Sequence, residues 1–317
     1  MLVWVLVAAG VLATATVWLR GWWRLPRDRG PERRLAAPLA IASIGAMFVA
    51  GAIAASLAPA LLSGDPDPDS LESLALRLGG LVLGQLLIGV PVWWLTCGAG
   101  SVSNEDDRLA DSNRTSMTAA ISLRLAGRTR SRAGASVLLG AVSMAVAYPV
   151  LASIATAAAT LESWLQGVPA ELVAHETLSQ LAQGGGLESL AGIAVMVLVV
   201  TGIPWIEELA YRGLLQPAVG RGLAAFFGSQ SESDGHAAAS ESPPVGRVRW
   251  FAIALTSVLF AAMHLPALPE ASRWSAVLTL WMVSMVLGWS YERTGRLWAP
   301  VAGHGLFNAI NLLLTFG

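Results

Sequence analysis

Long apolar stretches recur along the whole chain, and they constrain its fold more than any other feature. A helix of about 20 mostly apolar residues crosses a bilayer core of about 30 Å. Eight stretches reach or approach that length: 1–19, 38–62, 78–97, 136–161, 190–218, 250–265, 274–291 and 297–316. We therefore predict an all-α polytopic membrane protein with about eight transmembrane helices.

The composition supports this class and excludes several others. Charged residues make up 13% of the 317 residues, about half of the share in a typical soluble domain. The net charge of −1 lacks the basic excess of a nucleic-acid-binding protein, so we expect no nucleic-acid partner. A single cysteine, Cys97, excludes an internal disulfide framework. A cytosolic enzyme and a disordered chain are disfavoured on the same grounds.

The basic residues are unevenly distributed between the predicted connections. All 20 are Arg, and 17 of them lie in the connections at 20–37, 98–133, 220–249 and 292–296. The alternate connections contain only Arg77 and Arg273. The positive-inside rule therefore places the Arg-rich connections in the cytoplasm and both chain ends outside. A basic cluster follows the first apolar stretch instead of preceding it, so we expect a true span there and not a cleaved signal peptide.

The fifth stretch contains three ionisable residues, Glu207, Glu208 and Arg212. Each would cost about 2.5–3.5 kcal/mol at the centre of a span facing lipid, so we expect them to face the bundle interior. Glu208 and Arg212 are four residues apart and can pair on one helix face. Glu207 lies about 100° further around the helix, without a local partner, where a carboxylate could act as a general base. Alternatively, Glu207 marks the cytoplasmic end of the span.

The sixth and eighth stretches contain His264, His304 and Asn308. His304 and Asn308 are four residues apart and share a helix face. Each buried polar group would be unsatisfied alone, so we predict that they converge with the glutamates on one cavity, which favours a hydrolytic site. A purely structural role for either histidine is the alternative. His264 lies about 21 Å into its span and His304 only about 10 Å into its own, so a shared site requires the sixth helix to tilt or to start deeper, or the insertion before it to return into the bundle.

These residues form three motifs in order. Two glutamates, three residues and Arg stand at 207–212; Phe, three residues and His stand at 260–264; His, three residues and Asn stand at 304–308. Together they resemble the CPBP family, also called Abi, which comprises CAAX prenyl endopeptidases and bacteriocin-processing or self-immunity membrane proteins. The resemblance covers roughly 190–317 and implies an eight-helix intramembrane protease fold.

The resemblance also implies roles for the residues. Glu207 would activate water with help from His264. The oxyanion would be stabilised by His304 and Asn308, and Arg212 would hold Glu208. Glu207, His264 and His304 are also a possible zinc ligand set, but no His-Glu-x-x-His motif is present. We favour direct activation of water over zinc and assign no other cofactor.

The main prediction is an intramembrane endopeptidase of the bacterial plasma membrane that acts on membrane-associated or lipidated substrates. A non-catalytic self-immunity or partner-binding protein and a proton-coupled transporter are the alternatives. We divide the chain into N-terminal transmembrane helices with a cytoplasmic loop (1–133) and a catalytic region (134–317). We further expect a short surface helix around 119–125, a flexible cytoplasmic insertion at 228–244, and close helix packing at Gly80 and Gly84.

Overall fold

The computed structural model describes residues 37–62, 67, 69–98, 118–167, 181, 188–233 and 245–316, and the regular elements within them are all helices. In chain order they are α2 (Ala37–Leu62), α3 (Leu71–Gly98), α5 (Thr118–Gln166), α7 (Leu190–Val197), η2 (Leu198–Gly202), α8 (Ile203–Glu208), η3 (Leu209–Leu215), α9 (Gln216–Ser233), α10 (Val245–Met263), η4 (Leu265–Ala267), η5 (Glu270–Ser272), α11 (Arg273–Thr294) and α12 (Trp298–Phe316). The prediction of an all-α chain is confirmed.

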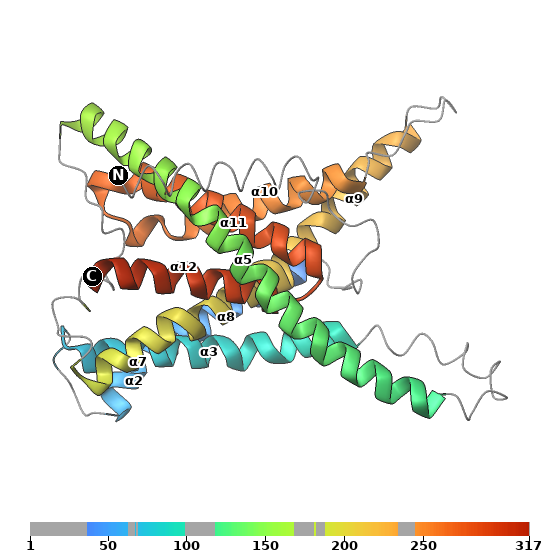
Figure 1. Ribbon diagram of the computed structural model, residues 1–317, viewed down its shortest axis with the longest axis horizontal. Coiled ribbons are helices and arrows are strands. Elements are labelled where there is room, and N and C mark those ends of the chain that lie inside the picture. Colours follow the sequence, from blue (N-terminus) through green and yellow to red (C-terminus); the bar gives the residue numbers. More distant parts are fainter. Residues whose placement is uncertain are drawn as a thin grey trace.

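Seven helical stretches of the described chain are long and apolar enough to cross a membrane. They are Pro38–Leu62, Leu71–Trp93, Ala133–Gln166, Leu190–Phe227, Gly246–Ala267, Glu270–Thr294 and Trp298–Phe316. They correspond to the second to eighth predicted spans, so the prediction of a multi-pass membrane protein is confirmed. The first predicted span, 1–19, lies outside the described residues. Successive stretches run in alternate directions along the long axis of the molecule (Figure 1).

Two expectations about the connections were wrong in part. The segment 118–132 is not a separate surface helix, because α5 continues without interruption from Thr118 to Gln166. The sequence contains no Pro between 118 and 148 that would end the helix there. The predicted insertion at 228–244 also starts later than expected, since α9 extends to Ser233. The rest of that insertion lies outside the described residues.

The pair of helices α2 and α3 packs through small residues, as predicted. A Cβ atom added to Gly80 would lie 2.5 Å from the carbonyl oxygen of Ala54, and one added to Gly84 would lie 2.5 Å from that of Ala50. Only glycine therefore allows these two backbones to approach so closely. Close approach through small residues is a common way for helices to associate in membranes.

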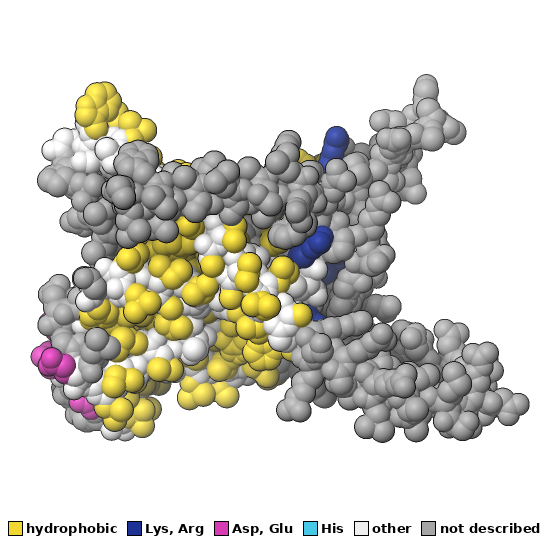
Figure 2. All heavy atoms as spheres, viewed as in Figure 1, with side chains coloured by type: hydrophobic (Ala, Val, Ile, Leu, Met, Phe, Trp, Pro, Cys, Tyr) yellow, Lys and Arg dark blue, Asp and Glu magenta, His cyan; other side chains and the backbone are white. Residues whose placement is uncertain are grey.

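The surface of the bundle is apolar between two polar ends. On the face shown in Figure 2, hydrophobic side chains cover the middle of the described surface, with Arg side chains at one end and Asp and Glu side chains at the opposite end. Large side chains such as Leu61, Leu87 and Leu313 are exposed on the outside of the helices. This inverts the pattern of a soluble protein and suits a protein surrounded by lipid.

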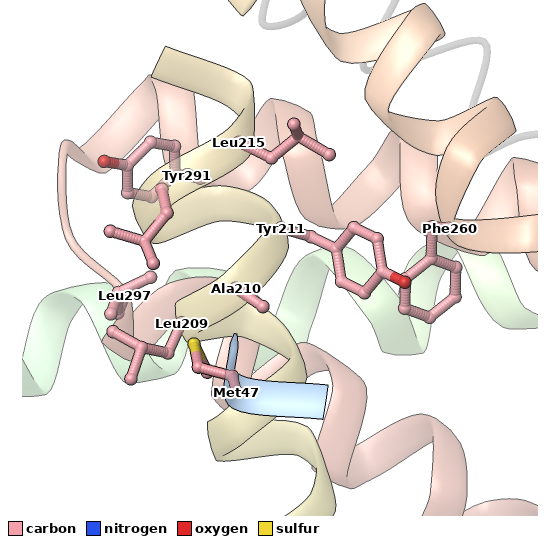
Figure 3. Close-up of a cluster of buried hydrophobic side chains, with 9 residues drawn as sticks. Met47, Leu209, Ala210, Tyr211, Leu215, Phe260, Tyr291 and Leu297 are labelled. Carbon is pink, nitrogen blue, oxygen red and sulfur yellow. The ribbon is translucent and has the colours of Figure 1, made fainter. Parts of the chain in front are cut away.

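The core of the bundle is built around η3. All seven of its residues, Leu209–Leu215, are buried. They pack with Met47 of α2, Phe260 of α10 and Tyr291 of α11 (Figure 3). The charged segment that precedes and overlaps η3 is thus at the centre of the bundle, which supports the interior placement expected for its ionisable side chains.

Candidate active site

The glutamate pair lies in a helix of irregular geometry. One continuous helical stretch runs from Leu190 to Ser233 and contains two π-helical segments, η2 and η3. Glu207 and Glu208 are the last two residues of the short α8 between them. Single π-helical turns within α-helices are frequent at functional sites.

Pro204 removes one backbone hydrogen bond from η2, and a side chain of α12 replaces it. In η2 the N–H of Ile203 donates to the carbonyl of Leu198, five residues earlier. The next bond in this register would run from residue 204 to Val199, but Pro204 has no N–H. The side chain of Asn308 supplies the missing donor, with its Nδ2 2.8 Å from the Val199 oxygen. Asn308 therefore fastens α12 to η2.

Glu208 and Arg212 form a fully buried ion pair. Arg212 Nη1 donates to Glu208 Oε1 at 3.0 Å, and both side chains are essentially inaccessible. Arg212 Nη2 also donates to the backbone oxygen of Ser284 at 3.0 Å and to its Oγ at 2.7 Å. Additional hydrogen bonds of this kind are needed for a buried ion pair to be stable. The predicted pairing of Glu208 with Arg212 is confirmed.

His304 is held by the same carboxylate. Its Nδ1 lies 2.9 Å from Glu208 Oε1, and because a carboxylate only accepts, Nδ1 is the donor. The ring is thereby oriented with Nε2 facing Glu207, 3.8 Å from Oε2. A carboxylate at one ring nitrogen of an imidazole fixes the orientation of the other nitrogen.

His264 approaches Glu207 from the other carboxylate oxygen. Its Nδ1 lies 2.8 Å from the carbonyl oxygen of Phe260, so this nitrogen also donates. Its Nε2 is 3.8 Å from Glu207 Oε1. The sequence predicts different depths for His264 and His304, but the structure brings both rings to one carboxylate.

The Glu207 carboxylate is partly accessible. A separation of 3.8 Å is too long for a direct hydrogen bond, and such gaps are often bridged by water. The Glu207 and His264 side chains are 19% and 20% exposed, whereas His304 is 7% exposed. One carboxylate between two imidazoles, open on one side, can take a proton from water and pass it on.

Phe260, one turn before His264, packs its ring against both histidines. Its ring centroid lies 4.6 Å from that of His264, 5.9 Å from that of His304 and 5.0 Å from that of Tyr211. The guanidinium carbon of Arg212 lies 5.0 Å from the same centroid, within the range of cation–π attraction. Figure 3 shows the Phe260 and Tyr211 rings beside one another. Phe260 is an apolar wall shared by both histidines.

Comparison with known proteins concerns this same region. Residues 189–310 match the family model described as type II CAAX prenyl endopeptidase, Rce1-like. The match confirms the resemblance. No curated protein and no solved structure matches the chain significantly. At the level of the family, the match supports a CAAX-protease-like intramembrane endopeptidase.

The Rce1-like region, residues 189–310, contains all six residues predicted for the site. The structure brings five of them into one network, namely Glu207, Glu208, Arg212, His264 and His304. The sixth, Asn308, bonds to the backbone of η2 instead. Ser284, which binds Arg212, was missed because one more serine in an apolar stretch carries no local signal.

No metal-binding site is identified in the described part of the chain. No group of three or more His, Cys, Asp or Glu side chains among these residues is placed to hold a metal ion. Glu207, His264 and His304 are therefore not identified as such a group, and we derive no step through a metal.

An apolar groove of about 570 Å³ opens between the helices of the Rce1-like region. Residues of η2, α8 and α12 line it, namely Val200, Thr201, Trp205, Trp298, Val301, Ala302, Gly305, Leu306 and Ala309. The rings of Trp205 and Trp298 lie 5.3 Å apart. Trp205 and Gly305 are close in sequence to Glu207 and His304, but neither Glu207, His264 nor His304 lines the groove.

Proposed function

We propose that this protein is an intramembrane endopeptidase that hydrolyses peptide bonds of membrane-associated substrates with water activated by Glu207. One observation carries the proposal: the Glu207 carboxylate lies 3.8 Å from the Nε2 atoms of both His264 and His304. A partly exposed carboxylate with two imidazoles can take up and release a proton. The match to an endopeptidase family over this region supports the same reaction class.

In the proposed reaction, Glu207 accepts a proton from a water molecule while the water oxygen bonds to the substrate carbonyl carbon. The carbonyl becomes a tetrahedral oxyanion. When the C–N bond breaks, Glu207 returns the proton to the leaving nitrogen, so no proton is gained or lost. His264, as exposed as Glu207, orients the water through Nε2, because its Nδ1 is committed to the Phe260 carbonyl.

His304 is the proposed oxyanion partner. Its Nδ1 is held by the buried Glu208 carboxylate, which leaves Nε2 as the ring nitrogen that faces the reacting atoms. Donors fixed in advance at the point where charge develops lower the barrier without reorganisation. The family resemblance assigns the same role to Asn308. One of its two N–H groups is occupied by Val199, so we assign it mainly to holding α12 in place.

Substrates are proposed to be lipidated or membrane-embedded polypeptides. The groove between η2, α8 and α12 is lined almost entirely by apolar side chains, which suits a hydrocarbon chain or an apolar segment better than a soluble peptide. The endopeptidase family that the chain resembles points to the same class of substrate.

The deciding experiment is comparative proteomics of membrane fractions from cells with the wild-type protein or Glu207→Gln, followed by cleavage of a candidate substrate by purified protein. We expect products that depend on Glu207. Glu270→Gln is the matched control, because the Glu270 side chain is 91% exposed and pairs with Arg273 instead of with a site residue. A Glu207→Gln protein that still cleaves would overturn the proposal. Substrate binding without cleavage would support a partner-binding protein, and proton flux would support a transporter.

A further inference from the structure

A ladder of polar contacts extends from the site along two helices. We call the helical stretch from Leu190 to Ser233 the catalytic stretch. Its Arg212 and Gln216, four residues apart, bond to positions at four-residue intervals on α11. We call these six positions the polar ladder: Glu208, Arg212 and Gln216 on one side, and Ser284, Gly288 and Glu292 on the other. Its upper rung is the Glu208–Arg212–Ser284 contact that holds His304.

The lower rung is centred on Gln216, the first residue of α9. Its buried side chain donates through Nε2 to the Gly288 carbonyl at 3.3 Å and to Glu292 Oε1 at 2.9 Å. Gly288 makes this approach possible. A Cβ atom there would lie 3.0 Å from Gln216 Oε1 and 2.9 Å from Ile253 Cγ2 of α10. Three helices therefore meet at this glycine.

Glu292 connects the lower rung to the helix that precedes His264. Arg249, near the start of α10, donates through Nε to Glu292 Oε2 at 2.6 Å and through Nη2 to the Glu292 backbone oxygen at 3.0 Å. His264 follows the last residue of the same helix directly. The two oxygens of Glu292 thus join the catalytic stretch to α10.

We propose that Gln216, Glu292 and Arg249 are positioning residues that set His264 against Glu207, while the upper rung sets His304. Apolar packing alone tolerates sliding between helices in lipid. Sliding at the lower rung would instead leave the buried Gln216 amide and the Glu292 carboxylate without these partners. Neither of the two His–Glu207 separations of 3.8 Å is held by a direct bond, so each depends on the register of its helix.

The test measures the two histidines separately, and the proposed function enters only through its second readout. The chain has four histidines, and the ring ¹⁵N resonances of His264 and His304 are assigned with His264→Gln and His304→Gln in the full chain. We expect Arg249→Gln and Glu292→Gln to shift the His264 resonance and to leave that of His304 in place. Ser284→Ala is expected to do the reverse.

Activity provides the second readout. A shift of about 1 Å in a catalytic group can cost up to about 100-fold in rate, so we expect Arg249→Gln to lower kcat at least about tenfold with KM unchanged. Glu270→Gln should change neither kcat nor the His264 resonance.

Two outcomes would overturn the proposal: an unmoved His264 resonance in folded Arg249→Gln, or equal shifts of both histidines. Arg249→Lys, which keeps the charge but not the two-point contact, replaces Arg249→Gln if that variant does not fold. A wild-type protein without peptidase activity would refute the proposed function, whereas the resonances would still test the ladder.

Discussion

Nδ1 of His304 lies 2.9 Å from Oε1 of Glu208, the same oxygen that accepts from Arg212. Glu208 is completely buried, whereas the neighbouring Glu207 is 19% exposed and 3.8 Å from its nearest imidazole nitrogens. Two adjacent carboxylates therefore have different surroundings. Glu208 organises the site, and Glu207 is the one available to water.

Substitution of the two glutamates should separate chemistry from stability. We expect Glu207→Gln to abolish cleavage with little change in Tm, because no short hydrogen bond holds its carboxylate. Glu208→Gln should lower both, since it leaves Arg212 buried without its counter-charge, at a cost of about 3–5 kcal/mol. Cleavage rates and thermal unfolding in detergent measure the two effects. A larger loss of Tm in Glu207→Gln than in Glu208→Gln would contradict this assignment.

The buried ion pair should show strong non-additivity. Arg212→Gln alone leaves Glu208 charged and buried, so we expect it to be destabilised by about 3–5 kcal/mol. The double variant Glu208→Gln with Arg212→Gln contains neither unpaired charge and should be more stable than either single variant. A double-mutant cycle of unfolding free energies measures the coupling. Purely additive losses would show that the pair is not coupled.

Asn308 should contribute mainly through the backbone of η2. Asn308→Ala removes the donor to the Val199 carbonyl, and an unsatisfied buried carbonyl costs about 1–3 kcal/mol. Pro204→Ala restores a backbone N–H next to this turn, so the double variant should unfold at a higher temperature than Asn308→Ala. Thermal unfolding of the three variants tests this. If Pro204→Ala gives no recovery, the missing N–H is not the reason for the Asn308 contact.

Close packing at Gly305 should be required for activity. A Cβ atom at this position would lie 2.6 Å from the Val200 carbonyl oxygen, so Gly305→Ala must push α12 away from η2 and displace His304. We expect at least a tenfold loss of kcat, because shifts near 1 Å have effects of up to about 100-fold. Gly79→Ala is the matched control, since its added Cβ would meet no atom within 4 Å. Equal activity of the two variants would refute a packing requirement.

Direct activation of water by Glu207 predicts that activity survives removal of metal. We expect purified protein to retain its cleavage rate after treatment with a strong chelator and to contain less than one zinc ion per chain. Elemental analysis together with the chelator assay measures both. Loss of activity that zinc restores would replace the direct mechanism with a metal-dependent one at this site.

The sequence by itself determined the class of fold and the local part of the site. Seven of the predicted spans appear as helices because about 20 apolar residues in lipid must satisfy their backbone polar groups internally. The pairing of Glu208 with Arg212 was equally predictable, since a spacing of four residues places two side chains on one helix face.

Only the tertiary structure decided the partners of Glu207. His264 and His304 lie on other helices, and residue spacing did not indicate that both would reach one carboxylate from opposite oxygens. The same holds for the bond from Arg212 to Ser284 and for the bond from Asn308 to Val199. Spacing along one helix specifies neighbours one turn apart, whereas contacts between helices depend on the tilt, rotation and register in which they pack.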